Sequence, residues 1–423
     1  MIQPNFTRER KRVNLRATLF NFQNLYRAYL DCRKHKRNTY HAAKFELNLE
    51  SEILKLEEEL QNHAYKPGKS ICFVVEEPSL REVFAASFRD RVVHHLLYNF
   101  LEPIFEPKFI DQSYACRKNK GIHQSLKNLL KYLLKVTHNN RKRAYFLHLD
   151  IRGFFMSLNK EILWELISNQ IKNPELLWLI KLIIFNDPIK NFTSKGDKSL
   201  FNKIPLHKSL FHVPKNQGLP IGNLTSQFFA NVYLNELDQF VKHSLKAKYY
   251  LRYVDDFLLL SQEKNQLKEW GNKIDIFLKE RLLLELNHQK TVFQNIDKGI
   301  DWLGYIVKPN YILVRRRVVK NLKRKLFLFN QILQNYLNNL AKQRQLLLPF
   351  LKNEPPLKLI EKMLSTINSY FGHFKHANTF KLRKYLYKNH FQNLRNYLEP
   401  KSSDFTSLRI NPEFLKRLKR ARK

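Results

Sequence analysis

The segment Tyr253-Val254-Asp255-Asp256 limits what this chain can fold into more than any other part of its sequence. Apolar residues precede it at 249–251 and follow it at 257–260. Two apolar runs on either side of a short polar step predict a β-hairpin, here with two carboxylates at its tip. Such charges cost free energy unless a cation or water neutralises them, so the plain alternative to an ion site is a solvated turn. Mg²⁺ is the natural cation, because it binds one or two carboxylates together with phosphates.

A second apolar strand, upstream at 146–151, also carries a carboxylate, Asp150. Together, Asp150, Asp255 and Asp256 supply oxygen ligands for two divalent ions about 4 Å apart, an arrangement used in phosphoryl transfer. In that chemistry one ion activates a hydroxyl nucleophile and the other stabilises the leaving pyrophosphate. The backbone carbonyl of Ile151 is a further candidate ligand. We therefore expect the three acids to meet in the folded chain.

Seven short motifs occur in the order found in reverse transcriptases, the RNA-directed DNA polymerases. The Tyr-x-Asp-Asp motif at 253–256 and the Leu-Asp-Ile-x-x-Phe-Phe motif at 149–155 resemble the two catalytic palm motifs of that family. Seven motifs in order are far more specific than any one of them. The other five motifs lie at 88–93, 113–117, 217–227, 286–291 and 302–305.

The resemblance implies the α+β fold of a right-hand polymerase, with fingers, a palm whose antiparallel sheet is backed by helices, and a helical thumb. We expect an N-terminal helical region at 1–75, fingers and palm at 76–310, and a basic thumb with a C-terminal extension at 311–423. Between the two palm motifs we expect a helix over about 160–185 and an irregular segment at 186–216. In the thumb, apolar residues recur every three or four positions and predict one long helix with a buried seam. The seam residues are Val319, Leu322, Leu326, Phe329, Leu333, Tyr336 and Leu340.

The motif at 217–227 departs from the pattern of most reverse transcriptases. It lacks the usual Ser-Pro pair and reads Gly-x-x-x-Ser-Gln at 222–227, which resembles the enzymes of diversity-generating retroelements. Those enzymes, which are of the bacterial retron and group II-like type, copy a template RNA into cDNA with errors at template adenines. They work with a small basic accessory protein. The alternative for Ser226 and Gln227 is a helix cap or a packing change without effect on fidelity.

Three other functions compete with this interpretation. An antiphage defence reverse transcriptase, using a dedicated non-coding RNA or extending DNA without a template, would share all seven motifs. A non-catalytic RNA-binding maturase is disfavoured by the intact acids Asp150, Asp255 and Asp256. An RNA-dependent RNA polymerase is disfavoured by Phe155, where a ribonucleotide enzyme needs room or a polar contact.

The resemblance also implies roles around the incoming nucleotide. Phe155 would stack beneath its sugar and exclude a 2′-hydroxyl, with a core aromatic as the plain alternative. Gln217 would hydrogen-bond the nucleotide, and Gly218 would allow close backbone approach. Lys290 would donate a proton to the departing pyrophosphate. The candidates for the triphosphate are three arginines, whose planar forks suit phosphate oxygens: Arg81, Arg89 and Arg91.

Primer and template contacts are expected at further positions. Tyr253 would pack near the primer end, and Leu303, Gly304 and Tyr305 would form the primer-grip turn. The basic tail at 416–423 is a candidate disordered arm for phosphates. The thumb helix would hold the duplex backbone through a basic face formed by Arg315, Arg316, Arg317, Lys320, Lys323 and Arg324.

The charge of the chain supports a polyanionic partner. Lys and Arg number 75 against 37 Asp and Glu, for a formal net charge of +38, and a charge that large repels itself unless a polyanion binds. An anionic membrane competes with nucleic acid, but no run of about 18 uncharged apolar residues predicts a membrane span. We expect RNA template, DNA or RNA primer, cDNA and dNTPs as partners, two Mg²⁺ ions (or Mn²⁺) as cofactors, and a small basic protein or structured non-coding RNA as a candidate accessory. No secretory signal and no paired-cysteine pattern is visible, so a cytoplasmic location is expected.

Overall fold

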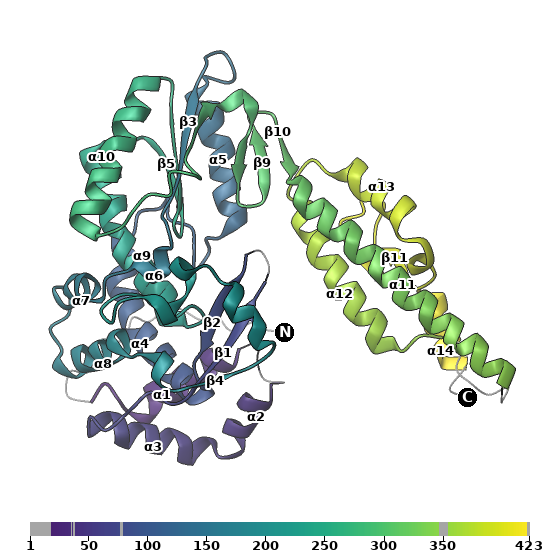
Figure 1. Ribbon diagram of the computed structural model, residues 1–423, viewed down its shortest axis with the longest axis horizontal. Coiled ribbons are helices and arrows are strands. Elements are labelled where there is room, and N and C mark those ends of the chain that lie inside the picture. The colour runs from purple at the N-terminus through teal and green to yellow at the C-terminus, as the bar shows by residue number, and fades with distance from the viewer. Residues whose placement is uncertain (1–17, 35, 37–38, 77–78, 347–353, 421–423) are drawn as a thin grey trace, which may run out of the picture. The chain divides into compact units, whose positions relative to one another are not determined.

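The computed structural model describes residues 18–34, 36, 39–76, 79–346 and 354–420. The chain divides into two compact units. The first comprises Leu147–Leu259, Asn265–Val292 and the described part of Met1–Gly121, and the second comprises Ile122–Phe146, Leu260–Lys264 and the described part of Phe293–Lys423 (Figure 1). The expected division into fingers, palm and thumb by residue range is not tested by these units and stays a prediction.

The amino-terminal part of the first unit is helical, and the first helix among its described residues begins at residue 22. The Asn21 side chain caps the first helix by accepting a hydrogen bond from the Asn24 N–H at 2.9 Å. Its buried face, with Leu25 and Ala28, packs against the third and fourth helices. Residues 1–17 of the expected helical region lie outside the described residues. The helices are α1 (Phe22–Arg33), α2 (Tyr40–Leu47), α3 (Leu49–Gln61) and α4 (Phe88–Phe105).

A small sheet connects these helices to the rest of the first unit. Its central strand β1 (Ser70–Val75) pairs antiparallel with β2 (Arg81–Ala85) and parallel with β4 (Phe192–Ser194). The end of β2 also binds the 217–227 motif, because the Phe84 N–H donates to the Ile221 carbonyl at 2.8 Å. This sheet therefore joins segments that are more than a hundred residues apart in the sequence.

The larger sheet of the first unit has β5 (Tyr249–Tyr253), β6 (Asp256–Ser261) and β3 (Tyr145–Asp150) hydrogen-bonded in that order. All four apolar residues 257–260 of β6 are buried, which is typical of a central strand covered on both faces. Two helices pack on the sheet, α9 (Leu224–Gln239) and α10 (Lys264–Leu282). The α+β fold class expected from the sequence is confirmed.

The single helix expected over 160–185 is wrong, because the structure has two helices there. α7 (Lys160–Ser168) ends before Asn173, whose side chain caps the next helix by accepting from the Leu176 N–H at 2.9 Å. Pro174 then begins α8 (Pro174–Phe185), since proline fits the first turn of a helix but not its interior. A short helix, α6 (Phe154–Ser157), precedes both.

The 186–216 segment is irregular, as expected, but it is tied to β2. Apart from β4 it contains only short 3₁₀ turns, at Pro188–Lys190, Lys198–Lys203, Leu206–Lys208 and Leu210–His212. The buried carboxylate of Glu82 accepts hydrogen bonds from the Ser209 hydroxyl at 3.0 Å and from the Leu210 N–H. Hydrogen bonds to a buried carboxylate are strong, so they hold the segment in one position.

The second unit contains a three-stranded sheet in the order β10-β9-β8. The buried Trp302 of β8 donates from its indole Nε1 to the Ser125 hydroxyl of α5 at 2.8 Å, which fixes that helix against the sheet. The elements before the thumb are α5 (Ile122–Val136), β7 (Val292–Asn295), β8 (Ile300–Trp302), β9 (Tyr305–Lys308) and β10 (Tyr311–Val314).

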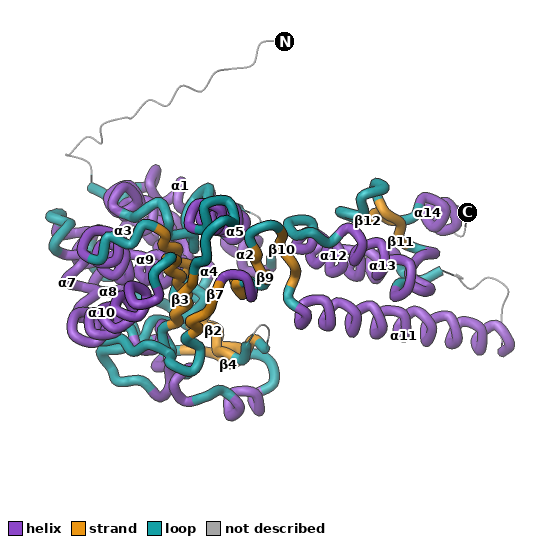
Figure 2. Tube along the Cα trace, turned by 90° about the horizontal axis from the view of Figure 1, so that it is seen from above, coloured by secondary structure: helices purple, strands orange, loops and turns teal. Residues whose placement is uncertain are grey.

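The predicted thumb helix is present as α11 (Arg316–Leu346), which is 31 residues long (Figure 2). Of the predicted seam, Leu322, Leu326 and Leu333 are fully buried, the other three described side chains are half-buried, and Leu340 lies outside the described side chains. The elements that follow it are α12 (Leu357–Phe374), α13 (Phe380–His390), β11 (Leu398–Pro400), β12 (Leu408–Ile410) and α14 (Pro412–Arg420).

The expected disordered tail is wrong for residues 416–420, which belong to α14. Phe414 of this helix is fully buried, and the Arg417 guanidinium forms an ion pair with Glu354. One anchoring aromatic and one ion pair therefore dock the helix on the second unit. Residues 421–423 lie outside the described residues.

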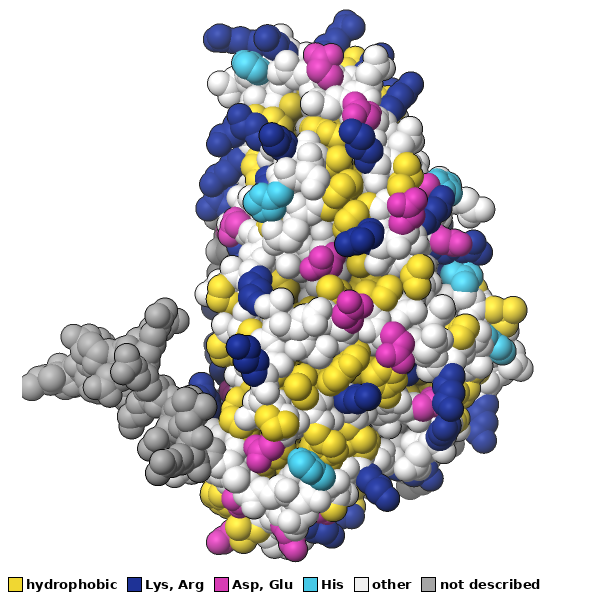
Figure 3. Space-filling model, turned by 90° about the vertical axis from the view of Figure 1, so that its left-hand side faces the viewer, with side chains coloured by type: hydrophobic (Ala, Val, Ile, Leu, Met, Phe, Trp, Pro, Cys, Tyr) yellow, Lys and Arg dark blue, Asp and Glu magenta, His cyan; other side chains and the backbone are white. Residues whose placement is uncertain are grey.

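On the face shown in Figure 3, the Lys and Arg side chains are dispersed and do not gather in one patch. On that face, Lys and Arg side chains alternate with Asp and Glu, and apolar side chains lie between them. Long basic side chains often cover apolar surface in this way while their charges stay in water. Among the helices that the structure describes, none is both long and apolar enough to cross a membrane.

Candidate active site

The predicted hairpin is formed by β5 and β6, joined by the two-residue turn Val254–Asp255. Val254 has φ +57°, whereas Asp255 has a negative φ. A positive φ at the first central residue alone is the pattern of a type II′ turn, which normally has glycine at that position. A β-branched valine there is strained by roughly 1–3 kcal/mol, and such strain persists only where surrounding contacts hold it.

The structure brings the three predicted acids together around this turn. The Ile151 N–H, at the end of β3, donates to the Asp255 carbonyl at 3.3 Å. Asp150 and Asp255 line the same pocket. Asp256 lies next to Asp255 in the hairpin, and its Oδ1 is 3.4 Å from Nε2 of His148, two residues before Asp150 on β3. Within the described part of the chain, no three His, Cys, Asp or Glu side chains already form a metal-ligand group.

The carboxyl group of Asp255 has a raised proton affinity. Burial raises the pKa of Asp255 to about 7, and the negative charges of Asp256 and Asp150 raise it as well. Near neutral pH this carboxyl group is therefore shared between its protonated and ionised forms unless a cation lies beside it. Asp150 is buried and already has polar partners on the chain.

Lys290 and Asn287 provide those partners. The Lys290 Nζ lies 2.8 Å from both carboxylate oxygens of Asp150, and the Asn287 amide donates to one of them at 3.1 Å. Burial lowers the pKa of Lys290, but the hydrogen bond and the charge of Asp150 outweigh it, so that the pKa is raised. The lysine therefore keeps its proton and presents an ammonium group beside the acids.

One pocket contains many of the residues singled out in the sequence. Its lining includes Asp150, Ile151, Phe155, Asp255, Lys290 and Arg81. Phe155 is half-buried, because one side of its ring packs on a core cluster that includes Phe84 and Met156. The ring therefore has a fixed position and still faces the pocket. Arg81, at the start of β2, adds a positive charge to the lining of this pocket.

Four predicted nucleotide-binding residues do not line this pocket. Arg89 forms an ion pair with Glu59, and its guanidinium lies 5.5 Å from the Tyr65 ring centroid. Arg91 donates from Nε to the Ala86 carbonyl at 2.9 Å. Their contacts hold α4 against its neighbours, so this structure does not favour them over Arg81 as triphosphate ligands.

Gln217 and Gly218 are the other two predicted nucleotide-binding residues that do not line the pocket. Gly218 has φ +81°, and a Cβ there would lie 2.8 Å from the Leu210 side chain. Its N–H donates to the Leu158 carbonyl at 2.9 Å. The close approach that this glycine permits is therefore to other parts of the same chain. Gln217, beside it, is half-buried, and its backbone forms an isolated antiparallel β-bridge with Asn159.

Several pocket residues were missed in the sequence, among them His207 and Lys208 of the 186–216 segment. A Cβ on Gly153, which has φ +56°, would lie 2.6 Å from the His207 carbonyl oxygen, so the segment packs directly on the loop that follows Asp150. Partial burial and the nearby charges of Lys208, Arg152 and Lys290 lower the pKa of His207. No local motif marks these residues, because a contact across fifty positions of sequence brings them here.

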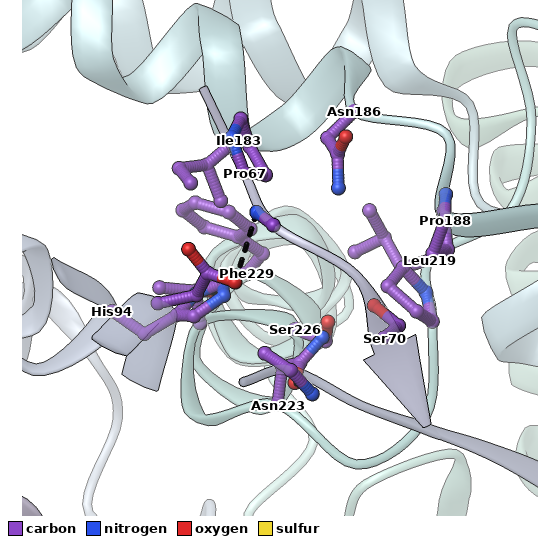
Figure 4. Close-up of a pocket in the computed structure, with 15 residues that line it drawn as sticks. Pro67, Ser70, His94, Ile183, Asn186, Pro188, Leu219, Asn223, Ser226 and Phe229 are labelled. Carbon is purple, nitrogen blue, oxygen red and sulfur yellow. Dashed lines mark hydrogen bonds between the residues drawn. The ribbon is translucent and has the colours of Figure 1, made fainter. Parts of the chain in front are cut away.

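Part of the unusual 217–227 motif lines a second, separate pocket (Figure 4). Ser226 and Asn223 of the motif line it together with His94 of α4. The His94 Nδ1 lies 2.7 Å from the Thr225 hydroxyl, and burial lowers the pKa of this histidine to about 4. Asn223 Oδ1 accepts from the Ala86 N–H at 3.2 Å. These contacts join α4 to α9, and Ser226 lies in this joint rather than in the pocket with Asp150.

The turn predicted at Leu303–Tyr305 is present in the second unit, and its role as a primer grip stays a prediction. Leu303 and Gly304 have φ +49° and +93°, the pattern of a type I′ hairpin turn between β8 and β9. The Tyr305 hydroxyl donates to the His373 carbonyl at 2.9 Å, and the two rings stack at 4.2 Å. Helix α12 therefore holds the turn from one side.

The predicted basic face of α11 is largely accessible. Lys320 and Arg324 are exposed together with Arg316 and Arg317. Lys323 is half-buried, with its Nζ 5.3 Å from the Tyr385 ring centroid. Arg315 differs from the others, because it forms an ion pair with Asp301. Contacts of this face with primer or template, and of Tyr253, which is half-buried, stay predictions.

Comparison with known proteins shows which family this chain resembles. Residues 69–307 match the model of the family described as "Reverse transcriptase (RNA-dependent DNA polymerase)". The chain is 23% identical over 289 residues to Protein YkfC of Escherichia coli (strain K12), covering 60% of this chain and 70% of that protein. It is 22% identical over 324 residues to the group II intron-encoded protein LtrA of Lactococcus lactis subsp. cremoris, covering 61% of this chain and only 50% of LtrA.

Among solved structures, matches include telomerases at low similarity. Apo telomerase from Candida tropicalis, truncated from its C-terminal domain, is 14% identical and has a TM-score of 0.42, covering 61% of this chain and 59% of its own. Telomerase from Candida albicans in complex with a fragment of telomeric RNA has a TM-score of 0.38, covering 84% and 62%. The family model, by contrast, covers more than half of the sequence. One of these relatives, LtrA, is a group II intron-encoded protein. The chain itself belongs to the reverse transcriptase (RNA-dependent DNA polymerase) family.

Proposed function

We propose that this protein is an RNA-directed DNA polymerase whose catalytic centre is the pocket between Asp150 and Asp255. The observation that carries the proposal is the meeting of two acids from distant strands with Phe155, Arg81 and Lys290 in one pocket. Phosphoryl transfer requires mainly the positioning of the reacting groups and the stabilisation of the charge that develops in the transition state. Acids for metal ions, basic groups for phosphates and an aromatic ring for the sugar are the groups that this reaction needs.

The donor set fits a divalent metal ion. Asp150, Asp255, Asp256 and the Ile151 carbonyl offer only oxygen, which hard cations such as Mg²⁺ and Mn²⁺ prefer. Burial and the charges of Asp256 and Asp150 raise the pKa of Asp255 to about 7, and the nearby Lys290 offsets only part of that rise, so a further cation would be favourable beside this carboxyl group. When bound, Mg²⁺ would supply charge stabilisation and a more acidic primer 3′-hydroxyl.

The chain's own residues would then orient the incoming nucleotide and protonate the departing pyrophosphate. Arg81 and Lys208 line the pocket with positive charge suited to a triphosphate, and His207, whose pKa is lowered, adds a neutral imidazole beside them. Lys290, whose raised pKa keeps it protonated, can leave Asp150 for the phosphates and donate a proton to the departing pyrophosphate. Phe155, fixed by the core on one side, would close the space that a 2′-hydroxyl needs.

We further propose that the enzyme serves a diversity-generating retroelement, with Mg²⁺ as the working ion, an RNA template and a small basic accessory protein. The Gly-x-x-x-Ser-Gln pattern at 222–227 supports this role. An antiphage enzyme with a dedicated non-coding RNA is the alternative. The two differ in the RNA that copurifies with the protein: a template repeat of a neighbouring gene supports the first, and a single structured RNA supports the second.

Replacing Asp255 and Asp256 by Ala should abolish Mg²⁺-dependent incorporation of dNTPs on a primed RNA template. We expect a loss of at least about 10³-fold in kcat, because both charges that would hold the ions are removed. Glu269→Gln, which removes a carboxylate from an exposed ion pair on α10, is the control and should retain full activity. Retained activity in the double alanine variant would refute the proposed site.

Phe155→Ala should admit ribonucleotides. We expect the ratio of kcat/KM for dNTP over NTP to fall by about 10-fold or more, since one removed contact is worth about 1–3 kcal/mol in discrimination. Phe155→Tyr keeps the ring and should keep most of the selection. Steady-state incorporation of matched dNTP and NTP pairs measures this, and an unchanged ratio in the alanine variant would remove Phe155 from this role.

Asp255→Asn should stabilise the metal-free protein at pH 8 and have little effect at pH 4. The raised pKa means that the folded state binds more protons than the unfolded state between pH about 4 and 7. Wild-type stability is therefore lost as pH rises through 7, and the neutral amide escapes this loss. Thermal unfolding in EDTA at both pH values measures this effect. The raised pKa is contradicted if the stability gained by the variant over wild type is no larger at pH 8 than at pH 4.

A further inference from the structure

Arg252, directly before the Tyr-x-Asp-Asp motif, has a guanidinium group that is completely buried. It forms a two-pronged ion pair with Asp238 of α9, with Nε 2.8 Å from Oδ1 and Nη2 2.6 Å from Oδ2. The Tyr250 hydroxyl donates to the same carboxylate at 2.8 Å. A buried pair of this kind seldom adds much net stability over an apolar replacement, so its presence calls for another explanation.

The third nitrogen of this guanidinium leads to the catalytic turn. Nη1 donates to the Val254 carbonyl oxygen at 3.1 Å and to Oδ1 of Asn231 at 3.2 Å. Val254 is the valine with φ +57°. Its carbonyl belongs to the peptide bond that enters Asp255, so a fixed carbonyl fixes the direction in which the Asp255 backbone leaves the turn.

The backbone of Arg252 is held as firmly as its side chain. Its N–H donates to the Gln112 carbonyl at 3.0 Å, and its carbonyl accepts from the Tyr114 N–H at 3.0 Å. Asn231 extends the network, because its amide donates to the Ala115 carbonyl at 2.8 Å. The 113–117 motif and α9 therefore meet at a single residue, which in turn contacts the turn.

We propose that Arg252 is a positioning residue that holds Val254 in its strained left-handed conformation and thereby aims Asp255 at Asp150. The ion pair with Asp238 fixes the guanidinium in one orientation, and the remaining donor acts on the Val254 carbonyl. Lysine has one point charge and cannot satisfy both partners with this fork geometry. The inference rests on the proposed role of Asp255 as a metal ligand.

The test is a double-mutant cycle with Arg252→Lys and Val254→Gly. Arg252→Lys should lower kcat by about 100-fold, because a displacement near 1 Å of a reacting group costs that much. The KM for dNTP should change by less than about threefold, since the nucleotide pocket is untouched. Arg281→Lys, on the exposed surface of α10, is the control and should change neither constant.

Val254→Gly distinguishes positioning from simple stabilisation. Glycine adopts positive φ without a steric penalty, so it no longer needs the guanidinium to hold the turn. The double variant should therefore regain about tenfold in kcat over Arg252→Lys alone, since strain of about 1.4 kcal/mol corresponds to that factor. A purely structural role of Arg252 predicts no recovery, with the two losses multiplying.

Hydrogen exchange supplies a readout that needs neither metal nor nucleotide. The Ile151 N–H donates to the Asp255 carbonyl, so the peptide that contains it should exchange faster in Arg252→Lys and slow down again in the double variant. If Arg252→Lys does not fold, Arg252→Met with Asp238→Leu leaves no unpaired buried charge and replaces it in the cycle.

The inference is overturned if folded Arg252→Lys keeps kcat within threefold of wild type, or if Val254→Gly restores neither kcat nor exchange protection. Asp255→Asn separates this failure from failure of the proposed function. An inactive Asp255→Asn with a fully active Arg252→Lys rejects only the positioning role. An active Asp255→Asn rejects the proposed site itself.

Discussion

Three carboxylates forced into one small space are the constraint on which the rest of this structure depends. Like charges a few ångströms apart repel one another, and burial adds to that cost. Asp255 shows the result directly, with a pKa of about 7. The surroundings offset only part of the repulsion: Lys290 and Asn287 bind Asp150, and basic side chains rim the pocket. Under the proposed function, the remaining negative charge would attract cations and the phosphates that accompany them.

The fold holds this unfavourable cluster in place through contacts from outside it. The apolar strand β6 and its neighbours form a rigid base, and the Ile151–Asp255 backbone contact joins two strand ends. The turn between β5 and β6 is strained at Val254 and is held by a buried guanidinium. Strain at a functional residue and a buried ion pair beneath it are two costs that a protein keeps only where geometry matters more than stability.

Much of this could be predicted from the sequence, because the relevant signals are local. Continuous apolar runs predicted the hairpin and the Asp150 strand, and the three- and four-residue spacing of apolar side chains predicted α11 with its buried Leu322, Leu326 and Leu333. The glycine at 304 gave the turn between β8 and β9. In each case one short segment contains the residues that decide its own conformation.

Most of the errors and omissions concern long-range contacts. The break between α7 and α8 is the exception, because residues 168–175 are mostly polar and their Asn173-Pro174 pair is a local helix-start signal that the single-helix prediction passed over. Arg89 and Arg91 looked like phosphate ligands, yet α4 directs them to Glu59 and to the Ala86 carbonyl. His207 enters the pocket through packing on Gly153. No spacing rule connects Arg252 with Asp238, since only the folded sheet and helix bring them together.

The most direct test of the central claim is to count bound metal ions in the absence of turnover. Mn²⁺ binding, followed by electron paramagnetic resonance in the presence of a non-hydrolysable dNTP analogue, should show two ions for each wild-type chain. The same titration of Asp150→Asn with Asp255→Asn should show that at least one of them is lost. Two ions bound with unchanged affinity by that double variant would contradict the account, because the acids at its centre would then not be the ligands.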